Sequence, residues 1–107
     1  MTADVTVLYF SGCPNWRTAV EQVHLAAGRA GVPVHVSTRL VETQQEAERI
    51  GLTGSPSIWL DEVDPFAQEG SVPALACRVY ATPEGLRGSP TVAQLSDVLT
   101  RNARRGS

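Results

Sequence analysis

Apolar residues in the first third of the chain follow two different periods. Residues 5–10 form an unbroken β-branched and aromatic run, which predicts a strand buried on both faces. After Pro14, apolar residues recur at helical spacing as far as Gly31, a typical helix stop. Residues 32–37 alternate apolar and polar, which predicts a second strand near a sheet edge. Together these elements predict a right-handed βαβ unit with parallel strands.

The next elements are shorter. Thr43 and Glu46 fit a capping box, in which Glu46 reaches back to the backbone of Thr43, and Gly51 ends the helix that the box opens. Residues 57–61 and 77–81 are rich in residues that favour strands, so we predict a third and a fourth strand there.

Two further segments complete the order of elements. Residues 62–76 show no clear period, and a loop of this length is typically functional or disordered. Residues 91–102 predict a last helix, which Ser89 can cap with Pro90 at its first position. The order βαβ-α-ββ-α predicts an α/β fold, with a four-stranded mixed sheet and helices on both faces.

Composition narrows the classes of protein to consider. With 107 residues, the chain is expected to form one domain, residues 1–103, followed by a flexible tail, residues 104–107. A net charge of -2 gives no attraction for nucleic acid. No run approaches the ~20 apolar residues of a spanning helix, so no membrane partner is expected. The amino-terminal residues lack the pattern of a signal peptide, so the predicted location is the cytoplasm.

Cys13 lies where the first predicted strand meets the first predicted helix. Unpaired amides and the positive end of the helix dipole favour an anion there, and they lower a thiol pKa from ~8.5 toward ~3.5–7.5. Cys13 would be the N-cap and Pro14 the first helical residue, leaving Asn15 and Trp16 as the nearest amide donors. A buried, unreactive cysteine is the alternative interpretation.

The sequence as a whole resembles the thioredoxin-like superfamily. The resemblance rests on the element order, on Cys13 at the first junction and on Gly54-Ser55-Pro56 before the third strand. The strings GCPNW, GSPS, DPFA, CRVY and GSPT are similar, more closely, to the DF family of bacterial thioredoxin-fold (seleno)proteins. Some of its members carry selenocysteine at the position matching Cys13. The resemblance implies redox chemistry at Cys13, a cis-proline at Pro56, and Ser55 backbone atoms open to an extended substrate or glutathione.

The sequence departs from the dithiol pattern because Trp16 stands where a resolving cysteine would be. The predicted function is therefore a monothiol oxidoreductase, in which the Cys13 thiolate attacks a protein or low-molecular-weight disulfide, or a peroxide. No resident cofactor is expected; glutathione or another small thiol serves as co-substrate. Trp16 lies on the apolar helix stripe and is expected mainly to pack. The expected substrate-binding residues are Pro14, Asn15, Trp16, Gly54, Ser55 and Pro56.

Cys77 and the two histidines leave alternatives open. Cys77 is either a buried strand cysteine or, if residues 62–76 fold back over the site, a resolving thiol for Cys13. His24 and His35 match no zinc spacing, and each is expected to be an ordinary surface histidine or one whose hydrogen bonds are satisfied within the fold. The alternative function is a non-catalytic thioredoxin-like binding module, or a thiol carrier of a soft metal such as mercury or copper. The sequence favours no oligomeric state.

Overall fold

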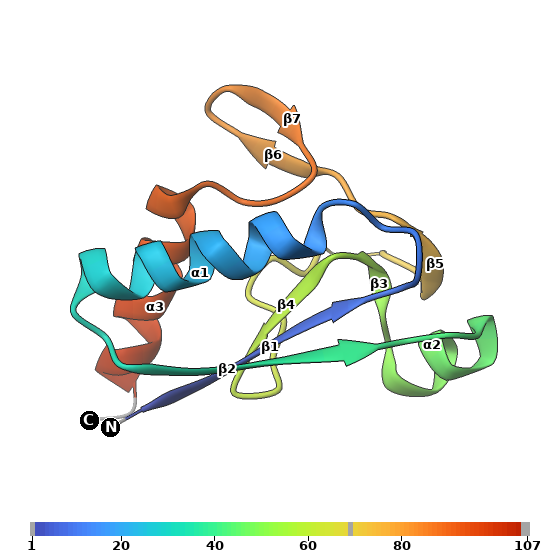
Figure 1. The fold of residues 1–107 in the computed structure, drawn as a ribbon, viewed down its shortest axis with the longest axis horizontal. Coiled ribbons are helices and arrows are strands. Elements are labelled where there is room, and N and C mark those ends of the chain that lie inside the picture. Colours follow the sequence, from blue (N-terminus) through green and yellow to red (C-terminus); the bar gives the residue numbers. More distant parts are fainter. Residues whose placement is uncertain (1, 69, 106–107) are drawn as a thin grey trace.

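The computed structural model describes residues 2–68 and 70–105. A three-stranded sheet with the order β2-β1-β4 lies at its centre (Figure 1). β1 (Ala3–Tyr9) is the middle strand; it runs parallel to β2 (Val34–Leu40) and antiparallel to β4 (Ser57–Leu60). The predicted pair of parallel strands is therefore confirmed, although β2 begins two residues later than the pattern indicated.

The helices divide the core into two parts. α1 (Trp16–Ala30) and α3 (Val92–Arg105) pack together on one face of the sheet, where they cover Val7 of β1. The short α2 (Gln44–Ile50) packs against Leu8, which points to the opposite face. The buried residues of the larger cluster are Ala3, Val5, Val7, Ala19, Val23, Ala26, Ala27, Ile58, Leu60, Leu95 and Leu99.

The α/β class is as predicted, but the expected four-stranded sheet is wrong. β3 (Thr53–Ser55) pairs with β5 (Ala74–Cys77) in parallel. β6 (Tyr80–Thr82) and β7 (Gly85–Arg87) form a separate antiparallel hairpin, which projects beyond α1 in Figure 1. The strand expected at residues 77–81 is thus divided between β5 and β6, and neither pairs with β4.

A tight reversal after β4 explains this difference. Asp61 and Glu62 have positive φ angles of 50° and 70°, and Val63 forms an isolated bridge with Leu60. The Leu60 N–H donates to the Val63 carbonyl at 2.7 Å. The chain that turns back beside β4 therefore belongs to the loop and not to the predicted fourth strand.

The capping box of α2 is confirmed with one change. The Glu46 N–H donates to the Thr43 hydroxyl at 3.0 Å, as predicted. The Glu46 carboxylate accepts from the N–H of Glu42 at 3.2 Å, one residue earlier than expected. Both bonds satisfy amides at the start of the helix, so they define its first turn.

The predicted cap of α3 is wrong. Thr91 caps this helix, because its hydroxyl accepts from the Gln94 N–H at 3.1 Å and its own N–H donates to the Gln94 side chain at 2.9 Å. Ser89 donates instead to the side chain of Gln22 in α1 at 2.7 Å. Pro90 consequently precedes the cap.

The carboxyl-terminal helix is longer than expected. α3 continues to Arg105, so the predicted domain boundary at residue 103 falls inside a helix. Residues 106–107 of the predicted tail lie outside the described residues. Among the helices that the structure describes, none is long and apolar enough to cross a lipid bilayer.

Candidate functional site

Cys13 lies in the turn between β1 and α1 and is only 4% exposed. Its N–H donates to the carbonyl of Phe10 at 3.1 Å. The helix begins at Trp16, and Asn15 is its N-cap, because the Asn15 carbonyl accepts the first helical bond, from the Ala19 N–H at 3.0 Å. The predicted N-cap role of Cys13 is therefore wrong, and the cysteine lies two residues before the cap.

The Pro56 loop is held against the end of β1. The Ser55–Pro56 peptide bond is cis, which confirms that prediction, and both residues are buried. The Ser55 hydroxyl accepts from the N–H of Phe10 at 3.2 Å. The Ser57 hydroxyl donates to the Gly54 carbonyl at 2.6 Å and closes the loop from the other side. The bond from Phe10 connects the loop to the turn that carries Cys13.

The Ser55 carbonyl is not open, contrary to expectation. It accepts from the Arg78 N–H at 2.8 Å, and Ser55 is paired with Cys77 in the register of β3 and β5. Residue 55 is 0% exposed. The protein's own β5 therefore occupies the backbone edge that an extended substrate was expected to use.

A buried ion pair lies beside this loop. The Arg78 guanidinium contacts the Asp64 carboxylate at 2.6 Å, and the two side chains are 9% and 13% exposed. Arg78 also donates to the Phe66 carbonyl at 2.7 Å and to the Ser57 hydroxyl at 3.1 Å. Its guanidinium carbon lies 4.6 Å from the centre of the Tyr80 ring. The DPFA and CRVY strings thus meet at one point, so residues 62–76 do fold back toward the Pro56 loop.

Tyr80 completes the network. Its hydroxyl donates to the Pro56 carbonyl at 2.6 Å, and its ring meets Phe66 edge-on at a centroid distance of 5.6 Å. Burial is the main cause that raises the pKa of the Tyr80 phenol above its ordinary value of 10.0, partly opposed by the nearby Arg78 charge. The phenol therefore stays protonated and remains a hydrogen-bond donor to the Pro56 carbonyl at neutral pH.

Raising the pH above 10 is expected to lower the free energy of unfolding through Tyr80. The folded protein keeps this proton while the unfolded chain releases it near pH 10, so the stabilisation is complete below that pH. Above it, each pH unit costs about 1.4 kcal/mol until the phenol ionises in the folded state. Urea unfolding of the wild type and of Tyr80→Phe, followed from about pH 8 to about pH 11, measures this. Parallel pH profiles for the two proteins would contradict the assignment.

Cys77 is exposed, so the interpretation as a buried strand cysteine is wrong. It lies at the end of β5, where Ala76 is exposed as well. Both cysteines are free thiols, so the proposed couple with Cys13 is not formed as a disulfide here. Cys77 opens into a cavity of about 300 Å³, whose other lining residues are Thr53, Phe66, Gln68, Ser71, Arg78, Val79, Tyr80 and Ala81.

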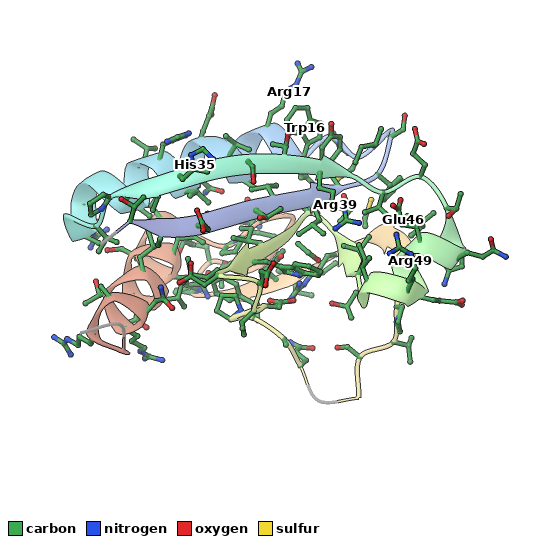
Figure 2. All side chains as sticks on the ribbon, turned by 90° about the horizontal axis from the view of Figure 1, so that it is seen from below. Trp16, Arg17, His35, Arg39, Glu46 and Arg49 are labelled. Atoms are coloured by element: carbon green, nitrogen blue, oxygen red, sulfur yellow. The ribbon has the colours of Figure 1, made fainter. Side chains whose placement is uncertain are left out.

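Trp16 mainly packs, as predicted. It is partly buried against the core and stacks on Tyr9, with ring centroids 4.4 Å apart and planes 14° from parallel. The Arg17 guanidinium carbon lies 5.2 Å from the Trp16 ring centre; Figure 2 labels both residues at the start of α1. The stack therefore braces the start of the helix that follows the Cys13 turn.

The remaining expected site residues have modest roles. Pro14 is exposed, and the side chain of Asn15 lies so close to Gly88 that a Cβ there would overlap its amide. In the part of the chain that the structure describes, no hydrogen bond joins Asn15 to the Cys13 sulfur. The histidines, His24 and His35, are exposed, as expected.

Sequence reasoning did not identify the network of Asp64, Arg78 and Tyr80. The only signal was the presence of DPFA and CRVY, because an arginine in a strand-like run ordinarily indicates a solvent-exposed position. Among the described residues, no group of three or more His, Cys, Asp or Glu side chains could hold a metal ion. No family model, curated protein or solved structure matches this chain. A functional interpretation therefore depends on the contacts around Cys13 and the Pro56 loop.

Proposed function

We propose that this protein is a thioredoxin-like thiol–disulfide oxidoreductase of the monothiol type, with Cys13 as its nucleophile. The hydrogen bond from the Phe10 N–H to the Ser55 hydroxyl carries the proposal, because it joins the Pro56 loop to the Cys13 turn. The strand order β2-β1-β4 and the start of α1 just after Cys13 support the thioredoxin-like assignment.

The exchange needs one protein sulfur and an external thiol. The Cys13 thiolate attacks one sulfur of a disulfide R–S–S–R′, so a Cys13–S–S–R bond forms and the original S–S bond breaks. The leaving R′–S⁻ carries the electron pair away and takes a proton from water. A glutathione thiolate then attacks the R sulfur and releases the Cys13 thiolate. The net reaction converts one disulfide and one glutathione into R–S–S–glutathione and R′–SH.

The burial of Cys13 restricts the substrates that fit this proposal. Because Cys13 is 4% exposed and the Arg78 N–H, just after β5, occupies the Ser55 carbonyl, an extended protein segment has little access to the sulfur. A small disulfide needs a smaller opening of the turn before α1. Low-molecular-weight disulfides, including glutathione adducts, are therefore the favoured substrates.

The wild type is expected to accelerate the glutathione-dependent reduction of 2-hydroxyethyl disulfide. Cys13→Ser is expected to return the rate to that of glutathione alone, because serine is not a sulfur nucleophile at neutral pH. Cys77→Ser makes the same change at the exposed thiol and is expected to keep most of the activity. A second glutathione then converts the hydroxyethyl–glutathione disulfide into glutathione disulfide and 2-mercaptoethanol. Consumption of NADPH by added glutathione reductase, which reduces the glutathione disulfide, measures each rate.

Two outcomes would contradict this mechanism in different ways. Equal loss of activity in the two variants would favour a Cys13–Cys77 couple over a monothiol. A wild-type rate no higher than that of glutathione alone would favour the second candidate, a binding module or soft-metal thiol carrier without turnover. The low exposure of Cys13 favours the binding module, because a buried sulfur is as closed to a metal ion as it is to a disulfide. Alkylation of the native protein, read by mass spectrometry, would then label Cys77 and leave Cys13 unmodified.

A further inference from the structure

The hydrogen bonds between β1 and β2 show which N–H and C=O groups of β2 point toward β1 and which point to its outer edge. At its start the Ala3 N–H donates to the Pro33 carbonyl at 3.0 Å, and just past its end the Val41 N–H donates to the Tyr9 carbonyl at 2.8 Å. Successive residues of a strand direct their N–H and C=O groups to opposite sides. Odd-numbered residues of this segment therefore bond to β1. The residues whose N–H and C=O groups point to the outer edge are Val34, Val36, Thr38 and Leu40.

This edge lacks the features that usually prevent strand pairing. The register with β1 is continuous over the whole strand, with no bulge and no proline inside it. Its one charged residue at neutral pH, Arg39, pairs with Glu46 of α2 at 3.8 Å. In Figure 2, β2 is the strand nearest the viewer and no other segment of backbone crosses in front of it. An exposed, regular edge of this kind is a template for another strand.

We propose that β2 pairs antiparallel with β2 of a second copy of this chain, about a two-fold axis that passes beside Ser37. In this register Val36 lies opposite Thr38 of the second copy, and Val34 lies opposite Leu40. Residues that face each other in this way exchange both N–H···O bonds. This register pairs every outward N–H and C=O group of β2, whereas a shift in either direction leaves some of them without a partner.

The even-numbered side chains of this pairing are also self-complementary, whereas on the other face His35 lies opposite Arg39 of the second copy. Val34 and Val36 pack partly against the core under α1, so the even-numbered side chains of β2 face that helix. Leu40 is 39% exposed, and Val34 of the second copy would cover it. The symmetry makes both surfaces identical, as in most homodimers. Pairing of one short strand is below the ~1,200 Å² of stable complexes, so the dimer is a weak one.

A cysteine at the symmetry axis tests the register directly. The two copies of Ser37 would form a non-hydrogen-bonded pair with Cα atoms about 4.5 Å apart, within the ~4.4–6.8 Å of disulfides. Ser37→Cys, made with Cys13→Ser and Cys77→Ser, is expected to form a covalent dimer under mild oxidation. Thr6→Cys in the same background is the control, because it lies beside Ser37 but on the central strand. Equal crosslinking of the two variants, or none in Ser37→Cys, would overturn the proposal.

Sedimentation of the wild type provides a second readout that does not depend on redox activity. Its average mass is expected to rise toward that of a dimer between about 10 μM and about 1 mM. Thr38→Pro removes an outward N–H and leaves the ladder with β1 intact, so it is expected to lose the dimer. If this variant does not fold, Thr38→Lys gives the same readout by placing a charge on the edge. A wild type that stays monomeric, or a folded variant that dimerises equally, would refute the pairing.

Discussion

Replacing Arg78 with methionine is expected to lower the free energy of unfolding by about 3 to 5 kcal/mol. The guanidinium is 9% exposed and forms an ion pair with Asp64 at 2.6 Å. Methionine keeps a similar length but supplies no charge, so the Asp64 carboxylate, 13% exposed, loses its cation in a largely dry site. The carbonyl of Phe66 loses its donor as well. Urea unfolding followed by circular dichroism measures the change.

Two further variants separate the cost of an unpaired charge from the loss of packing. Arg78→Met combined with Asp64→Asn removes both charges and is expected to recover much of the stability, because the amide oxygen can still accept from the Phe66 N–H. Arg101→Met breaks an exposed ion pair with Asp97 and is expected to cost less than about 1 kcal/mol. If Arg78→Met cost no more than Arg101→Met, the buried ion pair would not be a major source of stability.

The elements that sequence could predict are those whose signals act over a few residues. The unbroken apolar run of β1, the helical spacing of α1 and the capping box at Thr43 and Glu46 each involve neighbours in the chain. The apolar spacing and the hydrogen bonds of these elements therefore depend on residues close together in the sequence. Only the packing of their buried faces depends on the rest of the fold. The cis bond before Pro56 was expected from a resemblance and not from any local pattern.

The start of α1 shows how a local signal can mislead. Cys13 followed by Pro14 has the form of an N-cap and a first helical residue. The helix nevertheless begins later, because the first helical bond comes from the Asn15 carbonyl. The same error occurred at Ser89 and Pro90, where Thr91 provides the cap. A proline is compatible both with the first position of a helix and with the turn that precedes the helix, so the sequence alone does not distinguish these two places.

The site could not be predicted because its contacts span long stretches of sequence. Asp64 and Arg78 are 14 residues apart, and the Tyr80 hydroxyl reaches the Pro56 carbonyl across 24 residues. The segment containing Arg78 has strand-forming neighbours, but its arginine turns inward to Asp64 and interrupts a continuous strand. The pattern of apolar and polar residues does not predict such a contact, because each partner alone is typical of the protein surface.

Gly54→Ala is expected to lower the free energy of unfolding by about 2 to 6 kcal/mol, as the sum of two separate costs. Gly54 has a φ of +115°, a backbone conformation that alanine adopts at a cost of about 1 to 3 kcal/mol. A Cβ there would also lie 2.8 Å from the Arg78 Cβ and 3.3 Å from the Ala76 carbonyl oxygen. Relieving that overlap must displace β5 from β3, at a further cost of about 1 to 3 kcal/mol.

Gly85→Ala isolates the first of these costs. Gly85 has a similar φ of +104°, but a Cβ there would meet nothing within 4 Å. Thermal and urea unfolding of the two variants should therefore show a larger loss for Gly54→Ala, by the cost of moving β5. The displacement should also free the Ser55 carbonyl, so hydrogen exchange at the Arg78 N–H, its present donor, should accelerate in Gly54→Ala only. Equal losses of stability with unchanged exchange would mean that β5 does not lie against Gly54 as closely as these contacts require.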